Sequence, residues 1–299
     1  MPERSSLARL QQVLVVGLLV LSSTWLAWRW PHSPAIAIGG AVMIFFGYSI
    51  VLAAEFVLLR FVGDAHAPRP TWGEALRAWW GETCMALRVF FWRQPFRWRA
   101  ESDSLAPSPR RGVVFLHGFV CNRGFWNPWM RELRAAGHPF IAVNMEPVFG
   151  SIDRYADTID RAVTRVTEAS GGLAPILVCH SMGGLAARAW LRAKDASARV
   201  HHVVTIGSPH RGTWLGHFGH TSNGIQMRLE GEWVAQLAQH RRSVPFTCWY
   251  SNCDNIVFPA STATLPGADN RLVRGVAHVE LAFRPEIAAH TMQFLAAGV

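Results

Sequence analysis

The chain has 299 residues, of which 50% are hydrophobic and only 16% are charged, and this balance excludes an intrinsically disordered protein. Its net charge of +9 comes almost wholly from arginine, since Lys194 is the only lysine. The arginines gather between Arg60 and Arg111, beside two apolar runs and without a nucleic-acid motif, so we expect a membrane surface as partner and no nucleic acid.

The five cysteines are odd in number and show no metal-ligand spacing, so the sequence predicts neither a disulfide framework nor a metal site. Cys248 and Cys253 are close enough in sequence to pair if oxidised. Two reduced thiols fit their position beside a predicted loop better, which favours a reducing compartment. We also expect no cofactor.

Two apolar runs dominate the first sixty residues, from Leu10 to Trp28 and from Ala35 to Leu59. Each is long enough to cross a hydrocarbon core of roughly 30 Å as a helix. A polar break at 29–34 separates them, and the pattern predicts a transmembrane helical hairpin over residues 1–62. A cleaved signal peptide is the alternative for the first run, although no Ala-x-Ala-like site follows it. Core helices of a soluble domain are a third interpretation.

The arginines on either side of the hairpin predict its orientation. Arg4 and Arg9 precede the first run, a series from Arg60 to Arg99 follows the second, and the break contains only Arg29. The positive-inside rule then places both ends in the cytoplasm, at a bacterial-type inner membrane. Glu55, near the end of the second run, is either a functional intramembrane acid or a side chain that snorkels to the interface or pairs with Arg60.

Residues 63–111 are predicted to hold an amphipathic helix and a linker. The helix extends from Trp72 to Phe91, with Glu74, Arg77 and Arg88 on its polar face. Its apolar face is an aromatic-rich stripe of Trp72, Leu76, Trp79, Trp80, Thr83, Leu87, Phe90 and Phe91. The helix either lies in the headgroup layer or packs on the domain that follows. The composition of 105–111, with two prolines, is typical of a linker.

From residue 112 to 299 short apolar runs alternate with helical stretches, which is typical of βαβ units. We therefore expect an α/β domain with a mostly parallel sheet of about six strands and helices on both faces. The predicted strands are Val113–Leu116, Phe140–Val143, Ile176–Cys179, His202–Ile206, Phe246–Tyr250 and Leu272–Val276. The predicted helices are Arg131–Ala136, Tyr155–Ala169, Gly183–Leu191, Gly231–Gln239 and Pro285–Ala296.

The third predicted strand leads into Cys179-His180-Ser181-Met182-Gly183-Gly184 and then into a helix. A strand, a sharp turn bearing serine and a helix form the context of a nucleophile elbow. Ser181 is the candidate nucleophile. The glycines after it allow the helix to pack close to the strand. Cys179 stands where the usual motif has glycine, a departure that keeps the residue small. A surface turn with a capping serine is the alternative interpretation of the motif taken alone.

The first predicted strand ends in His117-Gly118-Phe119. A loop at this edge of the sheet can present a backbone N–H to an oxyanion, beside the N–H of the residue after the nucleophile. Phe119 and Met182 are therefore the candidate oxyanion-hole donors. His117 resembles a general base, but it precedes a tight turn, and a structural hydrogen-bonding role is expected for it.

A nucleophilic serine needs a base and an acid that orients the base. Asp254 follows the strand at Phe246–Tyr250, and His278 follows the next strand, so both are predicted at strand ends. Asp269 is a rival acid. His290 falls within the last helix and is expected at its surface. Each candidate alone has an ordinary structural interpretation, but their order and position together predict a Ser181–His278–Asp254 triad.

These motifs resemble those of bacterial lipases of the α/β-hydrolase superfamily. His117-Gly118-Phe119 looks like their oxyanion loop, and Gly275-Val276-Ala277-His278 looks like their histidine loop. The segment Gly207 to Thr213 looks like the loop after their next strand. The resemblance covers residues 112–299 and implies lipase or esterase activity; the hairpin lies outside it. Some members bind calcium, but no acidic cluster suggests such a site here.

The stretch from Thr213 to Gln239 is longer than a crossover needs and is rich in apolar residues. It is either a lid or wall of an acyl pocket, or a helix packed on the core with a long loop. The sequence as a whole predicts a membrane-anchored serine hydrolase that cleaves lipid-like carboxylic esters. An acyltransferase or thioesterase using the same triad is an alternative. A non-catalytic membrane scaffold that retains the fold is another, against which an intact triad argues.

Overall fold

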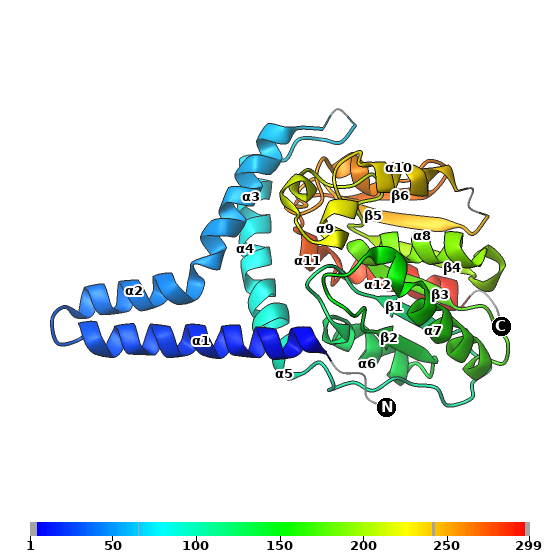
Figure 1. Ribbon diagram of the computed structural model, residues 1–299, viewed down its shortest axis with the longest axis horizontal. Helices are drawn as coiled ribbons and strands as arrows, with labels where there is room; N and C mark the ends of the chain where they lie inside the picture. Colours follow the sequence, from blue (N-terminus) through cyan, green and yellow to red (C-terminus); the bar gives the residue numbers. More distant parts are fainter. Residues whose placement is uncertain (1–4, 65, 241–242, 297–299) are drawn as a thin grey trace.

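The computed structural model describes residues 5–64, 66–240 and 243–296. An arm formed by helices α1 and α2 projects from a rounded α/β domain, and α3 and α4 run alongside that domain (Figure 1). The helices are α1 (Ser6–Arg29), α2 (Pro34–Phe46), α3 (Tyr48–Val62), α4 (Trp72–Arg88), α5 (Gln94–Phe96), α6 (Asn127–Ala135), α7 (Ala156–Ala169), α8 (Met182–Lys194), α9 (Ser222–Gln226), α10 (Glu232–Gln239), α11 (His278–Leu281) and α12 (Pro285–Ala296). The strands are β1 (Val113–Leu116), β2 (Phe140–Val143), β3 (Ile176–His180), β4 (His202–Ile206), β5 (Phe246–Ser251) and β6 (Asp269–Val273).

All six strands are parallel, in the order β2-β1-β3-β4-β5-β6. The strands β1 to β4 are buried along their whole length because helices cover both faces of the sheet. Their continuous apolar runs are the reason that the predicted bounds of β1, β2 and β4 match the structure. The predicted fold class, a six-stranded parallel sheet between helices, is confirmed for this part of the chain.

The sixth strand is the exception. The sequence predicts it at Leu272–Val276, but the structure places β6 at Asp269–Val273, three residues earlier. It is an edge strand whose first two residues are exposed, so its polar start carries no apolar signal. The shift moves Asp269 to the amino end of β6, where it pairs with Arg271 at 2.7 Å. Asp269 therefore lies at the edge of the sheet opposite to the predicted site, and it is excluded as the rival acid.

Successive residues of β1 point to opposite faces of the sheet and enter two separate cores. Val114 and Leu116 pack with α7, α8 and α10 on one face. Val113 and Phe115 pack with α6, α11 and α12 on the other. The two cores fix the sheet between its helices, so the loops at the carboxyl ends of the strands are built on a rigid frame.

The predicted hairpin is only partly reproduced. Helix α1, with 24 residues, is long and apolar enough to cross a membrane and is mostly exposed. The second predicted span is two helices, α2 and α3, which meet at Gly47 with a bend of 57° and qualify only as a broken span. With 13 residues, α2 extends about 20 Å, which is shorter than a hydrocarbon core. The structure thus contains one candidate spanning helix, or two if the bent pair is counted.

The start of α1 is attached to the α/β domain through side chains. The Ser6 amide and hydroxyl donate to the two carboxylate oxygens of Glu146 at 2.9 and 2.8 Å. One turn further, Gln11 donates to Gln94 at 3.2 Å. The side-chain amide of Gln12 donates to the backbone carbonyl of Pro95 at 2.6 Å. These bonds fix the point at which the arm leaves the domain.

Helix α4 packs on the α/β domain, which is the second of the two alternatives that the sequence leaves open. A capping box formed by Thr71 and Glu74 starts the helix. The buried face carries small residues and one acid, namely Ala75, Ala78, Glu82, Thr83 and Ala86. The predicted aromatic-rich stripe is divided between the surface and the interior. Trp72, Leu76 and Trp80 are each more than 60% exposed, whereas Thr83 is buried and Trp79 packs beside Ala75 and Ala78. Small side chains allow the close approach to the domain, while the three exposed side chains form an apolar outer surface.

Helix α8 approaches β1 so closely that only glycine fits at its first turn. A Cβ atom on Gly183 would lie 2.4 Å from the carbonyl oxygen of Leu116. Because backbone atoms of a central strand cannot move aside, we expect Gly183→Ala to lower the free energy of unfolding by about 1–3 kcal/mol. Urea denaturation of the detergent-solubilised protein measures this difference.

The matched control is Gly73→Ala on α4, where a Cβ atom would meet nothing within 4 Å. This change should be neutral or stabilise the protein by up to about 1 kcal/mol, because alanine favours a helix. Equal effects of the two substitutions would contradict the close approach of α8 to β1.

Candidate active site

Ser181 occupies a strained turn between β3 and α8. Its backbone has φ 54° and ψ −126°, in a region that residues with a side chain rarely adopt. The Ser181 amide donates to the carbonyl of Ile206, the last residue of β4, at 2.9 Å. This bond ties the turn to the neighbouring strand. The sharp turn between β3 and α8 is the strand-turn-helix arrangement that the motif predicts.

Glycines make room for this turn on both sides. A Cβ atom on Gly118 would lie 2.9 Å from the Cβ and 3.4 Å from the hydroxyl oxygen of Ser181. A Cβ atom on Gly184 would lie 2.3 Å from the hydroxyl of Ser208. The loop after β1 therefore passes directly against the serine, which only a residue without a side chain permits.

Asp254 and His278 form a buried pair beyond the ends of β5 and β6. The Nδ1 atom of His278 lies 2.9 Å from Oδ2 of Asp254, and both side chains are almost fully buried. The other oxygen of Asp254 accepts from the amides of Ile256 and Val257 at 3.0 and 2.7 Å. With the carboxylate fixed in this way, Nδ1 carries the proton and Nε2 is the free nitrogen of a neutral imidazole.

The serine and the pair converge on the end of β4. Ile206 accepts the Ser181 amide, and the next residue, Gly207, lies against the pair. A Cβ atom on Gly207 would lie 2.9 Å from Oδ2 of Asp254 and 3.1 Å from Nδ1 of His278. The structure thus brings the three predicted residues together at the carboxyl edge of the sheet, where an open α/β sheet binds its ligands.

Two opposing effects set the pKa of His278. Burial lowers it. The charge and hydrogen bond of Asp254, together with the charges of Glu82 and Glu55, raise it by more than burial lowers it. The net pKa of His278 is therefore above its ordinary value. An imidazole held in this way has a high affinity for a proton, as a general base requires.

The two predicted oxyanion donors have free amides. Within the described residues, neither the Phe119 nor the Met182 backbone N–H donates a hydrogen bond. Both lie beside Ser181, one in the loop after β1 and the other as the first residue of α8. The loop also contains Val120 with a positive φ of 52°, which marks a tight turn. These amides are available to a ligand atom bound near the serine hydroxyl.

His117 has the structural role that the sequence predicts. Its Nε2 accepts from the Met145 amide at 3.0 Å, so Nδ1 is the donor to the carbonyl of Gly118 at 2.9 Å. Burial lowers the pKa of His117 to about 4, and its ring stays neutral near pH 7. His117 thus connects the loop after β1 to the loop after β2 and has no free nitrogen for catalysis.

Helices from the N-terminal region cover the acid and histidine loops, a contact that the sequence analysis does not anticipate. Glu55 on α3 accepts a hydrogen bond from Asn255 at 2.7 Å, next to Asp254. Glu82 on α4 accepts from the backbone amides of Val279 and Glu280, next to His278. For Glu82 a sequence signal exists, since it recurs at helical spacing with Ala75, Ala78 and Ala86 on one face of α4.

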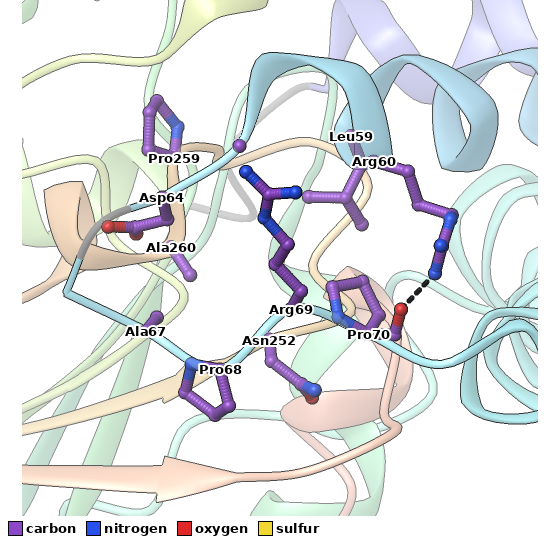
Figure 2. A pocket seen from close by; sticks show the side chains of 11 residues that line it. Leu59, Arg60, Asp64, Ala67, Pro68, Arg69, Pro70, Asn252, Pro259 and Ala260 are labelled. Atoms are coloured by element: carbon purple, nitrogen blue, oxygen red, sulfur yellow. Dashed lines mark hydrogen bonds between the residues drawn. The ribbon is translucent and has the colours of Figure 1, made fainter.

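The connection between α3 and α4 adds to this cover. Asp64 accepts from the Ser261 amide. The guanidinium of Arg60 donates to the carbonyl of Pro70 (Figure 2). A cavity of about 50 Å³ lies between this connection and Asn252 and Pro259. Figure 2 shows the side chains that line it. It is too small for a substrate, and Ser181 does not line it.

A larger groove of about 660 Å³ lies on the other side of the site. It is lined by the start of α1, by the 147–151 loop after β2 and by Ser222 of α9. One of its lining residues, Phe149, packs edge-to-face on Phe119, with 5.8 Å between ring centroids. Asn223, next to Ser222, contacts both the carbonyl of Val148 and the sulfur of Met182. The groove therefore reaches the candidate oxyanion residues through Phe149 and Asn223, and Ser181 itself does not line it.

The segment 213–239 forms part of this groove and packs on the core. Val234 and Leu237 of α10 belong to the core beside α8. The packed-helix interpretation thus describes α10, while α9 contributes to the groove wall. No group of three or more His, Cys, Asp or Glu side chains within residues 5–64, 66–240 and 243–296 has a geometry suited to a metal ion.

The comparisons with known proteins agree with this architecture. Residues 113–295 match the sequence model of the alpha/beta hydrolase family. A lipase of Bacillus licheniformis in its mature form is similar in structure, with a TM-score of 0.56 and 16% identity over 65% of this chain and 96% of that one. Lipase B of Aspergillus fumigatus is similar at a TM-score of 0.55 and 16% identity, over 67% and 56% of the two chains. No curated protein sequence matches significantly. At this identity the structural likeness shows the fold alone.

The Asp254–His278 pair predicts a pH-dependent stability. Because the pKa of His278 is raised in the folded state, the pair stabilises the fold fully below the unfolded pKa of about 6.5, and this is lost as pH rises through the folded pKa. Asn at position 254 can keep the bonds to the Ile256 and Val257 amides but removes the charge. We expect Asp254→Asn to lower the free energy of unfolding by about 3 kcal/mol just below pH 6.5, where the imidazole is charged. Above pH 8 the loss should be smaller.

Denaturation of both proteins across this pH range measures the difference. Asp157→Asn is the control, because Asp157 pairs with Lys194 at the surface of the domain and contacts no histidine among the described residues. Its effect on unfolding should be small and nearly independent of pH. A cost of Asp254→Asn that grows with pH would show that the pair does not hold a charged imidazole.

Proposed function

Since the chain belongs to the alpha/beta hydrolase family, we propose that it is a membrane-anchored serine hydrolase that cleaves lipid-like carboxylic esters. One observation carries the proposal: a strained serine turn and a buried Asp–His pair meet at the same edge of the sheet. Nucleophilic catalysis by serine uses these two features together, and their common position supports the proposal. The two structurally similar lipases share the fold of this chain, which is consistent with the proposal.

In the proposed reaction the hydroxyl of Ser181 attacks the ester carbonyl while Nε2 of His278 takes its proton. Asp254 holds the proton on Nδ1 and stabilises the imidazolium that forms. His278 then protonates the departing alcohol, and an acyl-enzyme remains on Ser181. A water molecule, deprotonated by His278, releases the carboxylic acid and restores the serine.

The tetrahedral intermediate carries a negative charge on the former carbonyl oxygen. The free amides of Phe119 and Met182 support an oxyanion hole beside Ser181. The amide of Met182 is also the first of α8, so the positive end of the helix dipole adds to the stabilisation. Loss of one such donor typically costs about 10²–10³ in kcat.

We assign the membrane contact to the arm and to the outer face of α4. The apolar side chains of α1 are mostly exposed, and Trp28 and Trp30 at its far end are suited to a headgroup region. On α4, the exposed Trp72, Leu76 and Trp80 form a second apolar surface. Both surfaces belong to segments outside the family match, so they adapt this chain to a bilayer. The arginine distribution supports a cytoplasmic catalytic domain at an inner membrane.

The groove between α1 and the 147–151 loop is the site that we propose for the acyl chain. Its lining includes Phe149, which packs on Phe119, and Leu7 and Leu10 of α1 form an apolar wall. The same helix then leaves the domain toward the proposed bilayer (Figure 1). An ester drawn from the membrane could therefore keep its chain against α1 while its carbonyl reaches Ser181.

The first test of the function is labelling with a fluorophosphonate probe, followed by mass spectrometry to locate the adduct. We expect the wild-type protein to be modified at Ser181, because a base-activated hydroxyl attacks the phosphorus centre, and Ser181→Ala to be unmodified. Hydrolysis of a short p-nitrophenyl ester should fall by about 10⁴ or more in Ser181→Ala.

Ser208→Ala is the control, since Ser208 is a buried neighbour outside the proposed triad. It should be labelled at Ser181 at a rate close to that of the wild type. Folded wild-type protein that remains unmodified both in detergent and in lipid vesicles would contradict a serine hydrolase and favour the scaffold interpretation.

The acyl groove predicts a change in chain-length preference. Leu10→Trp introduces a bulky ring into the groove, so kcat/KM for a dodecanoyl ester should fall about tenfold relative to a butyryl ester. Val13→Trp is the matched control, because Val13 is 71% exposed on the same helix and does not line the groove. If both variants shift the ratio equally, the acyl chain lies elsewhere.

A further inference from the structure

Helix α4 places one buried carboxylate directly under the histidine loop. Glu82 is only 3% exposed. Its Oε1 accepts from the Val279 amide at 3.0 Å, and its Oε2 accepts from the Val279 and Glu280 amides at 3.1 and 3.2 Å. In Figure 1, α4 is drawn next to α11, the short helix that begins with His278. The acid thus reaches the residues that follow the proposed base.

These amides need an external acceptor because α11 has none of its own. The residue before α11 is Ala277, whose side chain cannot accept a hydrogen bond. Glu82 therefore acts as the cap of α11 from another part of the chain, nearly 200 residues away. A serine or threonine at position 277 would cap the helix locally, so capping alone gives no reason to bury a charge.

The buried carboxylate also lacks a cationic partner. Within the described residues no salt bridge includes Glu82. Burial raises its pKa to about 7, although the His278 charge and the two amides act in the opposite direction. An uncompensated buried acid is costly, and such groups are concentrated at functional sites. The nearest group that can become positive is His278.

Two other contacts hold the backbone of His278 directly, and a third supports one of them. Its amide donates to Oδ1 of Asn255 at 3.3 Å, and its carbonyl accepts from Nε2 of His180 at 3.2 Å. Asn255 in turn donates to Glu55 of α3 at 2.7 Å. The histidine loop is thus fixed by the nucleophile strand, by the acid loop and by two helices from the N-terminal region.

We propose that Glu82, supported by Glu55 through Asn255, is a positioning residue for His278, so that α3 and α4 are part of the active site as well as of the membrane anchor. This inference rests on the proposed function. Both acids lie before residue 113, where the family match begins. The α/β domain holds His278 through Asp254, Asn255 and His180, but it lacks the two acids that we propose as further support.

The test compares Glu82→Gln with the wild type in kcat/KM as a function of pH, using a short soluble ester. Glutamine has nearly the shape of glutamate but carries no charge. Its side-chain NH₂ group also replaces one of the two oxygens that accept the Val279 and Glu280 amides, so a donor then faces a donor. We expect kcat/KM to fall by about ten- to hundredfold through misplacement of His278. The acid limb of the profile should move to lower pH by about half a unit or more, because the loss of a neighbouring anion lowers the pKa of His278.

The titratable groups around Glu82 are His278, Asp254 and Glu280 of the α/β domain, together with the Cys121 thiol. Glu55 of α3 acts on His278. Glu82→Asp retains the charge with a shorter side chain. It should keep the acid limb at the wild-type pH while kcat falls, which separates the charge from the position. It also serves as the test variant if Glu82→Gln does not fold.

The matched control is Glu74→Gln on the same helix, which removes a carboxylate that caps α4 and pairs with Arg274. It should lower thermal stability slightly and leave the acid limb in place. An unchanged acid limb and kcat/KM within twofold in folded Glu82→Gln would overturn the inference. If Ser181 of the wild type is not labelled, the proposed hydrolase function is wrong, but the inference about Glu82 can still be tested. The pKa of His278, measured by NMR, must then be lower in Glu82→Gln than in the wild type.

Discussion

The backbone of Ser181 is the constraint on which the arrangement of the site depends. A positive φ at a residue with a side chain is unfavourable by about 1–3 kcal/mol and persists only where its surroundings impose it. Here the Ile206 carbonyl holds the amide, while Gly118 and Gly183 bring β1 and α8 against the turn. Met182 is the first residue of α8, and the first amides of a helix have no acceptor within the helix. The strained turn thus sets a free helix amide directly after the serine, and Gly118 brings the Phe119 loop against the same turn.

A second constraint concerns the N-terminal helices, which have to satisfy two different neighbours. Helix α4 buries small residues against the α/β domain and exposes Trp72, Leu76 and Trp80. Helix α3 begins at the bend after α2 and ends against the acid loop, where Phe56 and Leu59 pack with Phe258. In the proposed membrane-bound protein, the position of the domain relative to the bilayer is thus set by the helices that contact the histidine loop. A rotation of α4 about its axis would disturb both contacts at once.

The sequence predicted the features that depend on local patterns. Buried parallel strands appear as continuous apolar runs, and the serine turn and the histidine loop are short motifs with their own geometry. Edge strand β6 lacks an apolar run, so its register was predicted three residues too late. The second span was predicted as one helix because composition does not reveal a bend at Gly47. Glu82 was missed because a helical pattern identifies two faces without identifying which one is packed.

The charges around His278 couple the events of the proposed reaction. Coulombic coupling is reciprocal: the anion of Glu82 raises the pKa of His278, and a positive His278 lowers that of Glu82. The pKa of about 7 already includes the positive charge of His278, so beside a neutral imidazole Glu82 keeps its proton to higher pH. As His278 takes the proton of Ser181, the ionised form of Glu82 is favoured and its bonds to the Val279 and Glu280 amides strengthen. The histidine loop is then held most firmly when the imidazolium exists, which is when its position relative to the oxyanion matters most.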